Sequence, residues 1–240
     1  MVTANGRECW SISPEKYCKA TVLNVEQKLN KEGKRLPTKC KTPVKIGYCS
    51  ELAVSRELKA DGVQYYMKLI GVLRWTYEIG QVDIIYETSI MSTHLALPRV
   101  GHLEELFHIF GYLKENIKRK IAFYPDHPLI DKQQFKKHDW YEFYRDAKEA
   151  ILGNMPPTRG NGVTMHCFEN ADLAGNTVTR RSQTGILIFI NRDPIIWHSK
   201  RQNTVEASTY GSEIGASTRS NVECKRYGVD PHLGIKQPSC

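Results

Sequence analysis

Apolar side chains recur at helical spacing through the first half of the chain and predict a group of helices. Ser13 and Pro14 suit the start of a first helix and Gly33 suits its end, with a rough apolar stripe between them. From about residue 61 to residue 116, apolar positions three and four apart predict three more helices, the second of which is stopped by Pro98. Methionine and aromatic residues at this spacing indicate a helical core rather than a cofactor site.

Two stretches interrupt this periodic pattern. Residues 33–50 combine glycine and proline with many basic side chains, and we expect them to form an extended linker. Residues 125–162 are rich in proline and charge and follow a short predicted strand at 121–124. We expect them to connect two domains, with a short helix at 139–150.

The last third of the chain has a pattern typical of strands. Residues 163–168, 185–190 and 195–199 are candidate strands, and the middle one is marked by its β-branched residues. A helix is expected from about residue 205 to residue 222. Three strands followed by a helix indicate an α/β or α+β domain.

Composition adds a class of partner and a compartment. The chain of 240 residues carries a net charge of +8, so nucleic acid is the obvious partner class, although a merely basic soluble protein has the same charge. The seven cysteines form no CxxC pair, which indicates reduced intracellular thiols rather than a zinc site. No apolar run approaches the roughly 18 residues that cross a bilayer, and the N-terminus lacks a signal-peptide pattern. We therefore expect a cytoplasmic or nuclear protein, with no membrane partner and no small-molecule cofactor.

Four short blocks in the last third are specific when taken together. They are residues 166–176 (HCFENADLAGN), 179–185 (TRRSQTG), 196–202 (IWHSKRQ) and 206–213 (EASTYGSE). In order and spacing this series resembles the RNase H domain of copia-type LTR retrotransposon Pol polyproteins, which read approximately DADxAG, RxSTSG, WxSK(K/R)Q and SSTxxE. Residues 66–75, 82–84 and 102–114 resemble segments that follow the reverse transcriptase palm in the same polyproteins.

The resemblance covers most of the chain and implies its organisation. Residues 1–124 would be the C-terminal, thumb- or connection-like part of the reverse transcriptase, residues 125–162 a linker, and residues 163–240 a truncated RNase H-like domain. The implied fold class is α/β (α+β), a helical region followed by a mixed sheet with a packed helix. Residues 163–222 are expected to form an antiparallel three-strand sheet with the helix on one face, and residues 62–116 a separate helical unit.

The resemblance also implies a catalytic centre, of which this chain keeps only a part. The family hydrolyses the RNA strand of an RNA–DNA hybrid with two Mg²⁺ ions, and Mg²⁺ prefers carboxylate oxygens. Asn170 stands at the position of the first catalytic Asp, Glu213 matches the Glu of the helix, and Asp172 matches a second, non-ligand Asp. Glu213 and, more weakly, Asp172 are therefore the candidate metal ligands. Asp230 suits a turn rather than the later catalytic strand, and we expect no productive Mg²⁺ binding.

Basic residues in the same blocks are candidates for phosphate contacts, with ordinary solvation of strand ends as the alternative. They are Arg180, Arg181, Lys200, Arg201 and Gln202. The YVDD-type motif of the polymerase site does not occur in the chain, so we expect no polymerase activity from it.

These features favour a retrotransposon remnant that is catalytically inactive and binds RNA–DNA hybrid or duplex weakly. One alternative is an active metal-dependent ribonuclease H in which Glu169 and Asp172 supply the missing carboxylates. The other is a host-retained, non-enzymatic nucleic-acid-binding protein.

Overall fold

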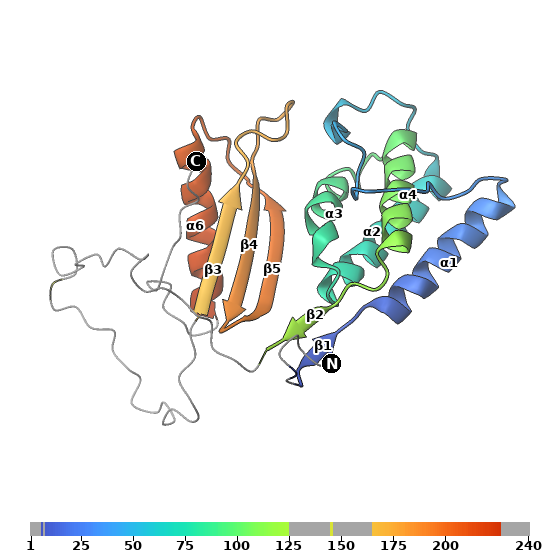
Figure 1. Cartoon of the computed structure of the whole chain (residues 1–240). Helices are drawn as coiled ribbons and strands as arrows, with labels where there is room; N and C mark the ends of the chain where they lie inside the picture. The colour runs from blue at the N-terminus through green and yellow to red at the C-terminus, as the bar shows by residue number, and fades with distance from the viewer. Residues whose placement is uncertain (1–5, 7, 125–144, 146–164, 227–240) are drawn as a thin grey trace.

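The computed structural model describes residue 6, residues 8–124, residue 145 and residues 165–226, except for the side chains of 221 and 223–226. Helices make up the first part and a sheet with one helix the second (Figure 1). No helix among these residues is long and apolar enough to cross a membrane. The helix predicted at 139–150 lies outside the described residues. In chain order the elements are β1 (Trp10–Ile12), α1 (Glu15–Lys31), η1 (Ser50–Leu52), α2 (Ala60–Glu78), η2 (Val82–Ile84), α3 (Ile85–Ser92), α4 (Val100–Glu115), β2 (Ile121–Phe123), β3 (Met165–Ala171), β4 (Gln183–Ile190), β5 (Asp193–Arg201) and α6 (Thr209–Arg226).

The first helix begins and ends where its signals predict. It starts directly after Pro14, while Ser13 accepts only a weak, 3.4 Å hydrogen bond from the first helical N–H. Gly33 follows the helix with φ at +69°, and its N–H and the next one bond to carbonyls of the last turn at 3.0 and 2.9 Å. This is a Schellman arrangement, which favours glycine because the left-handed conformation is strained for other residues.

Helices α1, α2, α3 and α4 share one apolar core. Tyr66 and Leu73 from α2 and Leu106 and Phe110 from α4 are completely buried in it. The Tyr66 hydroxyl is also satisfied, because it donates to the Met91 carbonyl at 2.7 Å and so connects α2 to α3. The predicted helical unit at 61–116 is confirmed, and α1 is part of the same core.

Residues 33–50 form a packed strap rather than the extended linker that their composition predicts. Leu36 and Cys40 are 6% and 2% exposed and belong to the helical core. The strap passes so close to α4 that a Cβ added at Gly111 would lie 2.5 Å from the Pro37 carbonyl oxygen. Glycine and proline indicate irregular backbone, but they do not show whether the apolar residues among them are buried.

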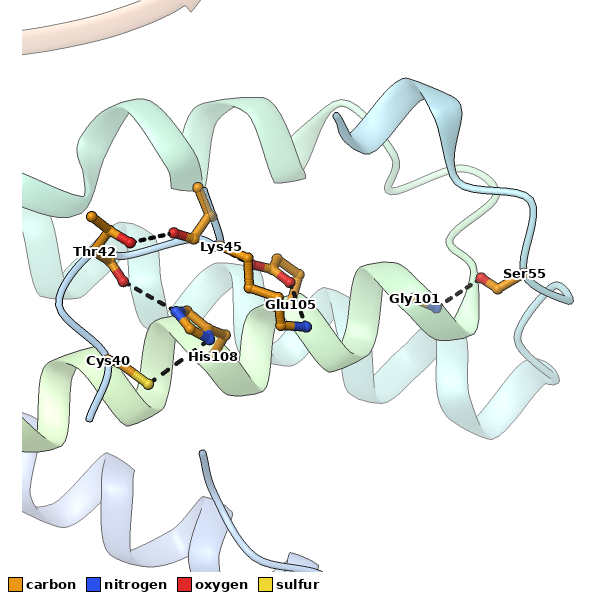
Figure 2. Close-up of polar contacts among 8 residues, drawn as sticks. Cys40, Thr42, Lys45, Ser55, Gly101, Glu105 and His108 are labelled. Carbon is orange, nitrogen blue, oxygen red and sulfur yellow. Dashed lines mark hydrogen bonds and ion pairs between the residues drawn. The ribbon is translucent and has the colours of Figure 1, made fainter. Parts of the chain in front are cut away.

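Polar contacts fix the path of this strap along α4 (Figure 2). The Lys45 backbone N–H donates to Glu105 at 2.6 Å, and the Lys45 ammonium lies 3.1 Å from the same carboxylate. The Glu105 side chain is 1% exposed, so both contacts compensate a buried charge. His108 lies 3.2 Å from the Thr42 carbonyl oxygen through Nε2.

The second part contains an antiparallel sheet in the order β3–β4–β5. Met165 pairs with Ile190 and Ala171 with Thr184, so the strands predicted at 163–168 and 185–190 share a sheet as expected. A two-residue turn joins β4 to β5, and such hairpins give antiparallel pairs, while a longer loop at 172–182 joins β3 to β4. The described strands are therefore antiparallel, in place of the mixed sheet implied by the resemblance.

Helix α6 packs against β3 and β4 and covers one face of this sheet (Figure 1). Ile186, Ile188 and Ala216 are at most 3% exposed. The helix begins at Thr209, four residues later than predicted. Sequence periodicity fixes the type of an element better than its ends.

The helical part and the sheet contact each other directly. Ser89 Oγ on α3 donates to the Ser199 carbonyl at 2.9 Å, and the Trp197 indole donates to the Tyr77 carbonyl at 2.9 Å. These bonds join the two parts, and the division of the chain into separate units stays a prediction. A second sheet, β1 paired with β2, lies below the helices in Figure 1. Its strand β1 was not predicted, because three residues show too little alternation.

Candidate functional site

Strand alternation assigns the candidate residues to two faces of the sheet. Ala171, Thr184 and Lys200 are neighbours in register and lie on the face covered by α6. Gln183 and Ser199 lie on the opposite face, where both bond to α3 through Ser89. The sheet is thus packed between α6 and, at β5, the helical part.

Asn170 lies on the face opposite α6 and is exposed. Its neighbour Glu169 points the other way, as predicted, and accepts a hydrogen bond from Ser220 on α6. The Glu169 carboxylate is therefore directed away from Asn170 and toward the helix. The position that the resemblance assigns to the first catalytic carboxylate holds a neutral amide, and the adjacent acid does not lie on the same face.

Asp172 is held by hydrogen bonds at the start of the β3–β4 loop. Its Oδ1 accepts from the Gln183 backbone N–H, and its Oδ2 accepts from the Tyr86 hydroxyl at 3.1 Å. Burial, followed by the nearby Asp172 charge, raises the pKa of Tyr86 to about 12. A Cβ added at Gly175 would collide with the Asp172 carboxylate. In this chain the Asp-Leu-Ala-Gly series therefore builds a loop around a hydrogen-bonded carboxylate.

Glu213, near the start of α6, is half-buried beside the end of β3. Its Oε1 accepts from the Ala171 backbone N–H at 3.4 Å. Glu213 therefore contacts the residue next to Asn170. Strand alternation, however, directs the Asn170 side chain to the other face of the sheet. In the part of the chain that the structure describes, no three His, Cys, Asp or Glu side chains gather closely enough to hold a metal ion. Within the described ranges, the residues present do not fit a two-metal site.

The five basic and amide candidates lie at the same end of the sheet. Arg180 and Arg181 belong to the β3–β4 loop, and this loop meets the end of β5 because Gln183 pairs with Arg201. The loop is ordered by its own bonds, including a 2.8 Å bond from the Arg180 N–H to the Asn176 carbonyl. Glu51 of η1 also accepts two bonds from Thr177, at 2.8 and 2.9 Å.

The side chains of Lys200 and Arg201 lie on different faces of the sheet. Lys200 is exposed on the α6 face, whereas Arg201 is directed toward the helical part. There, burial first and then the charges of His102 and Arg201 lower the pKa of His94 to about 4. The His94 and His102 rings stack at a centroid distance of 4.1 Å, and both lie 2.9 Å from Ser50 atoms.

Gln202 connects the end of β5 to α6. Its Nε2 donates to the Thr184 hydroxyl at 3.0 Å and to the Ser212 carbonyl at 2.8 Å. Arg219 of α6 lies beside it and was not predicted, because the family blocks end before this residue.

Comparisons with known proteins find several transposon polyproteins. Over 158 residues, 66% of the chain, it is 23% identical to the retrovirus-related Pol polyprotein from transposon RE2 of Arabidopsis thaliana, covering 8% of that protein. Over 209 residues, 84% of the chain, it is 22% identical to the corresponding polyprotein from transposon TNT 1-94 of Nicotiana tabacum, covering 13% of it. These similarities support a retrotransposon Pol origin.

The chain spans about a tenth of the length of the transposon polyproteins it matches. It is also 21% identical, over 158 residues, to the secreted RxLR effector protein 161 of Plasmopara viticola, with 66% of the chain and 87% of that protein aligned. No protein-family model and no solved structure matches the chain.

Proposed function

We propose that the chain is a remnant of a copia-type Pol polyprotein, comprising a post-palm reverse transcriptase region and an RNase H-like domain. In this proposal it contacts RNA–DNA hybrid but does not cleave it. One observation supports the contact: all five sequence-predicted phosphate-contacting residues lie at one end of the sheet, on an ordered loop and the end of β5. Phosphate contacts from such fixed positions would set the register of a duplex on the protein.

We expect no cleavage because too few carboxylates are placed to hold the metal ions. Two divalent ions at close range need several anionic ligands to offset their mutual repulsion. Asn170 is neutral, Asp172 is engaged by Tyr86 and Gln183, and Glu169 faces α6. Only Glu213 matches a family ligand, so Mg²⁺ would not be held productively.

Titration of the 240-residue chain with a labelled RNA–DNA hybrid at 50 and 200 mM salt tests the contact. Affinity should fall steeply, because phosphate contacts release counterions from the nucleic acid. The double variant Arg180→Gln/Arg181→Gln should bind more weakly and with a smaller salt dependence. The matched double variant Lys16→Gln/Lys68→Gln removes two exposed cations from α1 and α2 and should bind almost as the wild type.

Two results would contradict the proposed contact: no binding at low salt, or binding that does not change with salt. A loss of affinity that is equal in both double variants would indicate attraction by net charge alone. It would therefore remove the proposed role of the β3–β4 loop.

A further inference from the structure

A hollow of about 370 Å³ lies between the end of β5 and the middle of α6. A volume of this size is in the range of small-ligand sites. Basic, hydroxyl and amide residues predominate in its lining, and neither Asp nor Glu is among them. The lining residues are Thr184, Lys200, Arg201, Gln202, Asn203, Thr204, Gly215, Thr218, Arg219 and Val222.

Two hydrogen-bond donors of the lining are available to a ligand. Thr184 is 2% exposed and its hydroxyl accepts from Gln202 Nε2, so among the described residues the hydroxyl hydrogen remains able to donate. The Nε of Arg219 is buried and has no hydrogen-bond partner among the described residues. A buried donor without an acceptor is costly, and an anion in the hollow would relieve that cost.

The charge of the hollow also favours an anion. Lys200 lies on the same sheet face as Thr184, and neither Lys200 nor Arg219 has a carboxylate within 4.0 Å in the described part of the chain. The Arg201 side chain is directed to the other face, so it adds little here. Two positive charges line the same cavity, and charge-assisted hydrogen bonds from such groups bind phosphate strongly.

One acceptor in the hollow is also unused. Gln202 Oε1 is buried and has no donor in the described residues. The amide cannot simply be reversed, because its Nε2 donates to the Ser212 carbonyl at 2.8 Å. An acceptor beside two anion-binding donors fits a hydroxyl group next to a phosphate. In a nucleic-acid strand the ribose 2′-hydroxyl meets that description, and DNA lacks it.

We propose that this hollow binds the sugar–phosphate backbone of an RNA strand. Thr184, Lys200 and Arg219 surround the phosphate, and Gln202 Oε1 accepts from the 2′-hydroxyl. This inference rests on the nucleic-acid contact proposed above. It specifies an RNA strand as the ligand, and the phosphate and the 2′-hydroxyl as the groups that the hollow binds. Arg219 is the new member of the site.

Fluorescence anisotropy of the 240-residue chain with single-stranded RNA, DNA and 2′-O-methyl RNA of one sequence tests the site. Arg219→Gln should weaken RNA binding about tenfold, because it removes one charge-assisted hydrogen bond. Arg219→Lys keeps the charge but loses the guanidinium geometry, so it should give an intermediate affinity. Lys68→Gln, an exposed cation on α2, is the charge control and should stay within about twofold of the wild type.

Wild-type chain should bind RNA several-fold more tightly than DNA or 2′-O-methyl RNA, because neither competitor can donate to Gln202. Equal affinity for the three strands overturns the ribose contact. Equal loss in Arg219→Gln and Lys68→Gln overturns the phosphate contact. Circular dichroism melting of Arg219→Gln should match the wild type, which excludes unfolding as the cause.

Thermal denaturation with inorganic phosphate alone separates this site from the proposed function. Phosphate should raise the melting temperature of the wild type and not of Arg219→Gln. If phosphate stabilises only the wild type while RNA–DNA hybrid does not bind, the anion site stands and the nucleic-acid function fails. If hybrid binds but phosphate and Arg219→Gln have no effect, the hollow is not the site.

Discussion

Gly111→Ala should destabilise the helical part, although alanine is the better helix former. An added Cβ would lie 2.5 Å from the Pro37 carbonyl oxygen and 3.0 Å from Cys40 Sγ. Ordinary contact begins at 3.4 Å, so the strap would have to move by about 0.9 Å. That movement would disturb the packing of Leu36 and Cys40 against the helical core.

The size of the effect follows from two opposing terms. Glycine to alanine within a helix gains about 1 kcal/mol. Forcing extra volume into a packed core costs about 1–3 kcal/mol, and partial exposure of Leu36 adds to that cost. We therefore expect a net loss of about 1–2 kcal/mol, since the displaced atoms are backbone and cannot rotate away.

Gly71→Ala is the matched control for this change. Gly71 is an exposed residue inside α2, and an added Cβ there meets nothing within 4 Å. The free energy of unfolding of this variant should rise by up to about 1 kcal/mol. The two glycine changes should therefore shift stability in opposite directions. Urea unfolding followed by far-UV circular dichroism measures both. A Gly111→Ala variant as stable as Gly71→Ala would refute the packed strap.

Three further predictions concern pH, the β3–β4 loop and the catalytic position. Folding lowers the pKa of His94 from 6.5 to about 4, so the unfolded chain binds more protons between these values. The free energy of unfolding should therefore fall as the pH falls from about 6.5 toward 4, by about 1 kcal/mol at pH 5 after allowance for solvent screening. His94→Gln should make the midpoint of urea unfolding depend less on pH. Tyr86→Phe removes the bond to the loop carboxylate and should cost about 0.5–1.5 kcal/mol, whereas Tyr210→Phe, at an exposed position, should cost almost nothing in the same urea titration. Asn170→Asp alone should not produce hybrid cleavage in a gel assay, because a single added carboxylate does not complete the ligand set; Mg²⁺-dependent product from it would contradict this.

Periodicity predicted the elements of this fold and failed where burial depends on distant segments. The apolar spacing of α2 and α4 and the β-branched run of β4 were sufficient to identify them. The strap at 33–50 was interpreted as a linker because its two buried apolar residues, Leu36 and Cys40, stand alone among polar neighbours. Only their contact with α4, some seventy residues later, shows that they are core.

The candidate site was predictable in the same limited way. Motif spacing located Asn170, Asp172 and Glu213, and strand alternation correctly separated Glu169 from Asn170. The bond from Tyr86 to Asp172 could not be predicted, since the two residues are far apart in the sequence. Arg219 was not predicted because its place beside the end of β5 depends on how α6 packs on the sheet, and no local pattern encodes that packing.

Incubation of the purified chain with an RNA–DNA hybrid, labelled on the RNA strand, in Mg²⁺ or Mn²⁺ tests the central claim most directly. The account predicts hybrid binding without any metal-dependent RNA cleavage, identical in the wild type and in Glu213→Gln. Cleavage by the wild type that is abolished in Glu213→Gln would contradict the account and identify the chain as an active ribonuclease H.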